Sequence, residues 1–257
     1  MVKGFDKFKQ FFAPHSESFI VIGGTAMQLH GEDGGFTPRV TQDIDILVIV
    51  ERMSSDFTSA FHAFLREGGY ECYMAKNQDG ADKPRFYRFI KPKNEAFPTR
   101  IELLSSPLLP PPEGMSYMSL PDEPEESMSA IVLDRTYYEF ARANTTAING
   151  VPCLNRDALM VFKSVAYLNL INEYETTGNR LRLHDSKKHR KDVLALAGTI
   201  PPTDISSVPA VISERLHAFI KSIESRPDEW QSILDSLGDS TGNIEDYLIA
   251  IQRHFML

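Results

Sequence analysis

Residues 19–50 read FIVIGGTAMQLHGEDGGFTPRVTQDIDILVIV. An apolar, β-branched run at the start of this segment ends in Gly23-Gly24-Thr25, and a short helix-like pattern follows. After a loop rich in glycine and proline, Asp43 and Asp45 open a second apolar run. This order predicts a strand–helix–strand unit that carries polar residues at the ends of both strands.

The two aspartates are expected on one face of the second strand, because side chains alternate between faces along a strand. Their Cα atoms would then be roughly 6–7 Å apart. Two carboxylates at this distance repel each other, and a divalent cation between them would offset the repulsion. Mg2+ binds carboxylate oxygens and leaves room for substrate phosphates. Asp43 and Asp45 are therefore candidate magnesium ligands.

The glycine corner, Gly23-Gly24-Thr25, lies at a predicted strand-to-helix turn. Glycines there allow backbone N–H groups to approach a phosphate, and the N-terminus of a helix favours negative charge. Taken separately, a Gly-Gly pair is most often only a turn, and an Asp-x-Asp pair is most often a solvated strand end or a cap. Together in one strand–helix–strand unit, the two features favour nucleotide chemistry.

The composition is that of a globular protein. The chain has 257 residues, of which 42% are hydrophobic and 24% charged, enough for one large domain or two small ones. We expect no membrane segment and no signal peptide. Cys72 and Cys153 lie far apart without metal-ligand spacing, which predicts a cytoplasmic protein with free thiols.

The charge distribution limits the class of partner. The net charge of −8 argues against nucleic acid covering the whole surface, but it allows a local basic patch. The dense basic cluster lies at Lys187–Lys191. A solvated helix face is the simplest explanation of such a cluster.

The remaining sequence predicts a strand-rich half followed by a helical half, and hence an α+β fold with a mixed sheet and flanking helices. Asn149-Gly150 predicts a type I′ hairpin turn, and Asn155 and Asp185-Ser186 are expected to cap the two helices that follow. A polar, turn-like loop is expected at 174–183. The other predicted elements are helices at 5–12, 55–68, 205–223, 227–237 and 244–255, strands at 70–75, 86–90, 98–104, 130–133 and 137–141, a polar turn at 76–83 and a Pro-rich acidic loop at 105–127.

Three further polar positions lie in apolar surroundings. Glu102 alternates with Ile101 and Leu103 in a predicted strand, so it needs a polar partner unless it lies on an exposed edge. Lys163 sits among apolar residues of a predicted helix, where its ammonium either extends to solvent or reaches an anion such as phosphate. Lys191-Asp192 enters the apolar stripe of the next helix. The simplest explanation of this pair is a basic helix start with an internal ion pair.

Gly23-Gly24-Thr25-Ala26, followed by Arg39-x-Thr41-x-Asp43-Ile44-Asp45, resembles the signature of DNA polymerase β-like nucleotidyltransferases. The similarity is closest to the AbiEii branch, the toxin component of abortive-infection and type IV toxin–antitoxin systems. It is sharp over residues 19–50 and weaker but ordered at 100–104, 154–168 and 187–196. The resemblance implies a nucleotidyltransferase-like sheet as the catalytic core at 1–154, and a helical C-terminal subdomain at 155–257 that completes the cleft.

The resemblance also implies an activity, namely transfer of an NMP from an NTP to a hydroxyl acceptor with Mg2+. The acceptor stays open between RNA such as the end of a tRNA, a protein hydroxyl and a small molecule, and a cognate antitoxin is the implied protein partner. A catalytically silent protein of the same fold that binds nucleotide or a partner is the alternative. The implied catalytic residues and metal ligands are Asp43, Asp45 and Glu102, and the implied nucleotide-binding residues are Gly23, Gly24, Thr25, Lys163, Lys191 and Asp192.

Overall fold

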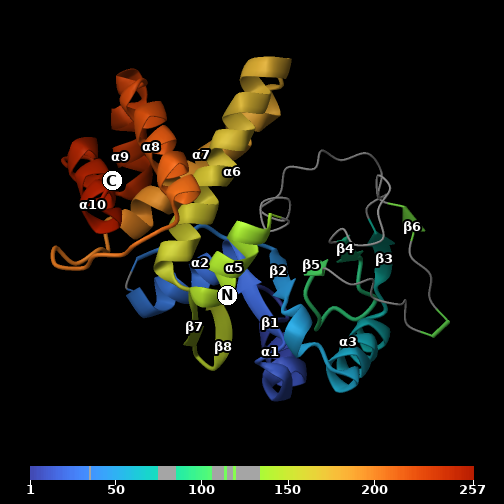
Figure 1. Ribbon diagram of the computed structural model, residues 1–257. Coiled ribbons are helices and arrows are strands. Elements are labelled where there is room, and N and C mark those ends of the chain that lie inside the picture. The colour runs from blue at the N-terminus through green and yellow to red at the C-terminus, as the bar shows by residue number, and fades with distance from the viewer. Residues whose placement is uncertain (35, 75–84, 106–112, 115–117, 120–133) are drawn as a thin grey trace. The chain divides into compact units, whose positions relative to one another are not determined.

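The computed structural model describes residues 1–34, 36–74, 85–105, 113–114, 118–119 and 134–257. The described residues form two compact units, which divide in the sequence between Asn155 and Arg156. Unit one contains the sheet, whereas unit two is helical (Figure 1). The predicted α+β class with a helical C-terminal part is thereby confirmed. The functional roles predicted for the two domains stay predictions. The expected turn at 76–83, the strand at 130–133 and most of the loop at 105–127 lie outside the described residues.

The sheet of unit one is mixed, as predicted. Within the described residues it has eight strands in the order β6-β3-β4-β5-β2-β1-β8-β7. The pairs β1–β8, β2–β5 and β3–β6 are parallel, and the other neighbours are antiparallel. The strands are β1 (Phe19–Ile22), β2 (Asp43–Val48), β3 (Glu71–Met74), β4 (Arg85–Ile90), β5 (Arg100–Ser105), β6 (Met118–Ser119), β7 (Thr145–Ile148) and β8 (Val151–Leu154).

The central strands present one apolar face and one charged face, because successive side chains alternate. On the apolar face Phe89 of β4 and Ile44 of β2 flank the β5 residue Ile101, in register and fully buried. One residue further along each of β5 and β2, Glu102 and Asp45 are paired in register on the opposite face. The chain therefore places its hydrophobic core and its acidic residues on opposite sides of the same strands.

Aromatic side chains of two helices cover the apolar face. Phe8 of α1 meets Phe19 of β1 with ring centroids 5.6 Å apart, and Phe61 of α3 meets Phe89 of β4 at 5.3 Å. The predicted phenylalanine face of the N-terminal helix is therefore part of the core. The helices of unit one are α1 (Phe5–Phe12), α2 (Gly23–Gly34), α3 (Ser55–Gly68) and α5 (Arg135–Ala143), with short 3-10 turns η1 (Ala13–His15) and η2 (Val50–Arg52).

One predicted strand of unit one is wrong. Residues 137–141 lie in the helix α5, because Tyr137, Phe140 and Ala141 are buried at helical spacing. Asp134 caps this helix by accepting a hydrogen bond of 2.8 Å from the backbone N–H of Thr136. A five-residue apolar pattern fits either periodicity, and the preceding cap was the signal for a helix.

The predicted hairpin is confirmed. Asn149 and Gly150 have φ values of 52° and 77°, and β7 and β8 pair antiparallel on either side of them. Positive φ at both central residues is the requirement of a type I′ turn, which Asn-Gly meets at low cost.

Unit two consists of α6 (Arg156–Thr177), α7 (Arg180–Ala197), α8 (Ala210–Glu224), η3 (Pro227–Glu229), α9 (Trp230–Leu237) and α10 (Ile244–Phe255). The polar loop predicted at 174–183 is wrong, and so is the cap at Asp185-Ser186, since both residues lie inside α7. Gly178 adopts φ 70° after α6, and Asn179 caps α7 by accepting a hydrogen bond from Leu181 N at 3.1 Å. Two residues, Gly178 and Asn179, are enough to separate α6 from α7, and the polar residues on either side belong to the two helices.

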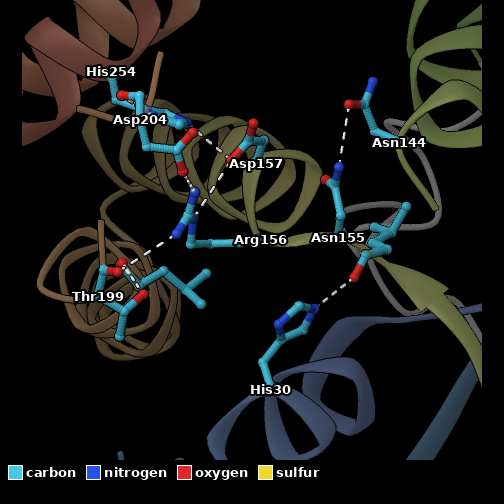
Figure 2. A network of polar contacts seen from close by, with 10 residues as sticks. His30, Asn144, Asn155, Arg156, Asp157, Thr199, Asp204 and His254 are labelled. Atoms are coloured by element: carbon cyan, nitrogen blue, oxygen red, sulfur yellow. Dashed lines mark hydrogen bonds and ion pairs between the residues drawn. The ribbon is translucent and has the colours of Figure 1, made fainter. Parts of the chain in front are cut away.

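A network of polar contacts joins the start of α6 to the last helix of unit two (Figure 2). The fully buried His254 lies 3.0 Å through Nδ1 from the carbonyl oxygen of Asp204, and 2.9 Å through Nε2 from Asp157 Oδ1. Since both oxygens are acceptors, both ring nitrogens must donate, and the ring is an imidazolium. Burial lowers the pKa of His254, but the hydrogen bonds to Asp157 and Asp204 outweigh burial and raise the pKa above its ordinary value of 6.5.

Arg156 extends this network to the segment after α7. Its guanidinium donates to the carboxylate of Asp204 and, at 3.4 Å, to the carbonyl oxygen of Thr199 (Figure 2). In unit one, His30 on α2 donates through Nε2 to the carbonyl oxygen of Leu154 at 2.8 Å, which ties α2 to the end of β8. None of the helices in the described ranges is both long enough and apolar enough to cross a membrane.

Truncation of the core residue Phe64 should destabilise unit one strongly. Its ring is fully buried and lies 5.3 Å from the ring of Phe12 and 4.9 Å from that of Phe97, by their centroids. We expect Phe64→Ala to lower the free energy of unfolding by about 3–5 kcal/mol. Urea unfolding followed by circular dichroism measures this change. Val40→Ala, at a side chain that is 84% exposed, is the control and should change stability by less than about 0.5 kcal/mol. Equal effects of the two variants would contradict the assigned core.

The stability of unit two should fall as the pH rises above the ordinary pKa of histidine. A raised pKa in the folded state means that His254 contributes fully below about pH 6.5, and that this contribution is lost as the pH rises through the folded pKa. Trp230, the single tryptophan, reports on unit two in urea unfolding. The stability difference between wild type and His254→Gln should shrink between about pH 6 and pH 9. The exposed His217→Gln is the control, and a pH-independent difference for His254→Gln would exclude the imidazolium.

Candidate functional site

The charged face of the sheet brings three carboxylates together. Asp43 and Asp45 alternate with buried Ile44 on β2, so both lie on the charged face. In the parallel pairing with β5, Asp45 lies opposite Glu102 and Asp43 lies opposite Arg100. Neighbouring strands are about 4.8 Å apart, so the three predicted acidic residues form one cluster near the beginning of β2.

The glycine corner lies directly against this acidic cluster. Gly23 follows β1 with φ 68°, and a Cβ atom at this position would lie 1.9 Å from Oδ2 of Asp45. A Cβ atom on Gly24 would lie 2.7 Å from Oγ1 of Thr41. Side chains are therefore excluded at both positions by close neighbours, and at Gly23 also by the left-handed backbone. The corner predicted to bind phosphate and the predicted metal ligands are adjacent.

Thr25 joins the start of α2 to the start of β2. Its hydroxyl donates a 2.6 Å hydrogen bond to the carbonyl oxygen of Asp43, and its side chain is fully buried. The residue therefore fixes the position of the first aspartate relative to the N-terminus of the helix. Contact of its hydroxyl with a phosphate stays a prediction.

Two arginines that were not predicted as site residues lie among the carboxylates. Arg88 on β4 is the in-register neighbour of Glu102, and its Nε donates to Glu102 Oε1 at 2.9 Å. Arg100 on β5 has its NH1 atom 3.4 Å from Asp43 Oδ2 and 3.9 Å from Glu102 Oε1. Strand alternation in residues 85–90, RFYRFI, was the available signal, because it places Arg88 on the face opposite Tyr87 and Phe89.

The Glu102 carboxyl is in an environment of opposing influences. Burial raises its pKa above the ordinary value, the guanidinium of Arg88 opposes that rise, and the negative charge of Asp43 adds to it. Arg100 lowers the pKa further. The ion pair with Arg88 joins side chains that are 15% and 9% exposed, so solvent screens it weakly.

The residues fit magnesium at the two aspartates better than at all three acids. Mg2+ commonly takes one or two carboxylates and completes its shell with water and substrate phosphate. Asp43 and Asp45 supply such a pair, and Glu102 is bound more tightly by its arginine, with Arg88 Nε 2.9 Å from Oε1, than Asp43 is by Arg100 at 3.4 Å. Across the described ranges, no three His, Cys, Asp or Glu side chains are arranged as a ready metal site.

Two of the three site residues predicted in unit two form a buried ion pair. Lys163 on α6 is completely buried, so its ammonium does not extend to solvent, and it donates to Oδ2 of Asp192 on α7 at 2.6 Å. Lys191 on the same helix is partly exposed, and Arg190 pairs with Glu229. Asp192 therefore holds Lys163 in place, and the contacts of both lysines with nucleotide stay predictions.

Comparison with known proteins supports the similarity seen in the sequence. The model of the family described as nucleotidyl transferase AbiEii toxin, type IV toxin–antitoxin system, matches residues 10–243. The match contains the glycine corner, the acidic cluster and the Lys163–Asp192 pair. Comparison with curated proteins gave no match. Because the family model covers most of the sequence, the chain belongs to the AbiEii family of nucleotidyltransferase toxins of type IV toxin–antitoxin systems.

Proposed function

We propose that this protein transfers a nucleotidyl group from an NTP to a hydroxyl acceptor. The observation that carries the proposal is the adjacency of the acidic cluster to the glycine corner, where a Cβ on Gly23 would touch the Asp45 carboxylate. Metal-binding carboxylates and phosphate-binding backbone N–H groups must be neighbours for this chemistry. Membership of the AbiEii family supports the transferase class.

In the proposed reaction, Asp43 and Asp45 would hold Mg2+, which would supply positive charge against the triphosphate and lower the pKa of the attacking hydroxyl. The first backbone N–H groups of α2 have no carbonyl acceptor within the helix, and they bind the phosphate oxygens. The acceptor oxygen forms a bond to the α-phosphorus as the bond to the bridging oxygen breaks. The proton of the acceptor hydroxyl passes to a water molecule, and the bridging oxygen leaves with the β- and γ-phosphates as pyrophosphate.

Lys163, Lys191 and Asp192 are proposed to act with nucleotide through charge. Lys191 is the accessible member of the three and would contact a phosphate, whereas Asp192 orients Lys163. Phosphoryl transfer depends mainly on positioning and on neutralising developing charge, which suits these roles.

RNA, such as the end of a tRNA, is the proposed acceptor. Arg180, His184, Lys187 and Lys191 recur along one side of α7 at helical spacing, and the first three are exposed. The three cations of this row, Arg180, Lys187 and Lys191, suit a phosphodiester backbone. A cognate antitoxin is the proposed protein partner, as the type IV family implies, and the cytoplasm is the proposed site of action.

Replacement of one aspartate should remove activity while leaving the fold intact. Purified protein is incubated with Mg2+, total RNA and NTPs labelled at the α-phosphate. We expect Asp45→Asn to reduce label transfer at least about a hundredfold, equivalent to about 3 kcal/mol of transition-state stabilisation. Glu95→Gln, at a side chain that is 93% exposed, is the matched control and should keep wild-type activity.

The same assay distinguishes the acceptors. Label in RNA from the wild type supports the proposal, and label only in protein or in a small molecule would replace the RNA acceptor. NTP binding that requires Mg2+ without label in any acceptor would identify a catalytically silent protein and contradict the proposed reaction.

Loss of one partner of the buried pair in unit two should be more damaging than loss of both. Lys163→Met leaves the Asp192 carboxylate buried without its ammonium, and we expect the stability of unit two to fall by about 3–5 kcal/mol. The double variant Lys163→Met/Asp192→Leu should recover most of that loss. Urea unfolding followed by Trp230 fluorescence measures both, and equal losses in the two variants would show that the pair contributes through packing rather than charge.

A further inference from the structure

We infer that Glu102 anchors Arg88 rather than a metal ion, and that Arg88 is a cation through which the charged face of the sheet binds the triphosphate. This inference rests on the proposed nucleotidyl transfer. It changes the role expected for Glu102 from ligand or base to positioning residue, and it assigns a nucleotide-binding role to a side chain on β4.

The sheet register places Glu102 between a cation and an acid. Arg88 lies opposite it on β4, and Asp45 lies opposite it on β2. The carboxylate is bound toward Arg88, whose Nε lies 2.9 Å from Oε1, and Arg100 lies 3.9 Å from the same oxygen. Hydrogen bonds between charged partners are among the strongest in proteins, so this contact determines where the Glu102 carboxylate points.

Moving Glu102 to a metal ion would be unfavourable. The Arg88 side chain is 15% exposed, and its guanidinium stays charged at every accessible pH. Movement of Glu102 away from Arg88 would break this short hydrogen bond between charged partners at a largely buried position. Mg2+ does not require a third carboxylate, because it usually takes one or two carboxylate ligands from a protein and Asp43 and Asp45 supply two. The arrangement is therefore most stable with Glu102 on Arg88 and the metal on the aspartates.

The guanidinium of Arg88 is well suited to phosphate. It is planar, and its N–H donors match phosphate oxygens in a way that an ammonium does not. β4 is the second strand from β2, so the Cα atoms of Arg88 and Asp45 are about 10 Å apart. A triphosphate that begins at the aspartates can extend across this distance. Because Glu102 fixes the arginine beforehand, little side-chain entropy is lost when the nucleotide binds.

The Arg88 and Glu102 variants separate the two roles of Glu102. Full-length protein is titrated with Mn2+ as a spectroscopic substitute for Mg2+, and separately with Mg2+ and an NTP whose α,β-bridge is a methylene group and cannot be cleaved. We expect Arg88→Gln and Glu102→Gln each to weaken binding of the analogue by about tenfold or more, with Mn2+ affinity within about twofold of wild type. The double variant should bind the analogue no more weakly than Arg88→Gln, because both changes remove one interaction.

Two further variants keep the experiment decisive. Arg88→Lys retains a cation for Glu102 but loses the planar donor group, so it should fold and still bind the analogue more weakly than wild type. Lys91→Gln, at the exposed Lys91–Glu71 pair at the end of β4, removes one cation elsewhere on the same unit and should leave analogue binding unchanged.

The possible failures are distinguishable. A tenfold loss of Mn2+ affinity in Glu102→Gln would identify Glu102 as a ligand and overturn the inference. Wild-type analogue binding by Arg88→Gln or Arg88→Lys would also overturn it while leaving the proposed function intact. Failure of the wild type itself to bind the analogue or to transfer label would instead refute the proposed function.

Discussion

The register of β2 against β5 is the constraint on which the candidate site depends. Asp45 lies opposite Glu102 because the two strands pair in parallel with that alignment. A slip of one residue would turn every side chain of one strand to the other face and would expose buried leucine and isoleucine. The apolar face, packed against α1 and α3, makes such a slip costly. The aromatic core of unit one therefore determines where the carboxylates stand, although it packs on the opposite face of the sheet.

Negative charge on the charged face of the sheet is balanced by arginines from neighbouring strands. Acidic side chains from β2 and β5 face arginines from β4 and β5. The contact is 2.9 Å for Arg88–Glu102, whereas it is 3.4 Å for Arg100–Asp43. The tighter contact is also the more deeply buried one. Glu102 is therefore held more tightly by its arginine partner than Asp43 is by Arg100.

Much of this arrangement could be predicted from the sequence. The acidic pair, the glycine corner and Glu102 carry short-range signals, because alternation and turn chemistry act over a few residues. Arg88 was not predicted as a site residue because its role depends on the pairing of β4 with β5, which a single sequence does not show. The same limit explains Lys163, whose partner Asp192 lies on a different helix. The helix at 137–141 and the tight turn before α7 were missed for a local reason, since capping by Asp134 and by Asn179 outweighed the apparent periodicity.

Glycine at position 23 limits which substitutions the protein can accept there. At most glycines an added methyl group disturbs packing or backbone, but here it would also strike a carboxylate oxygen. Such a change would displace charge at the cluster while the aromatic core on the far face of the sheet kept its contacts. A side chain at this residue would therefore act twice, by straining a left-handed backbone and by displacing a carboxylate on the charged face.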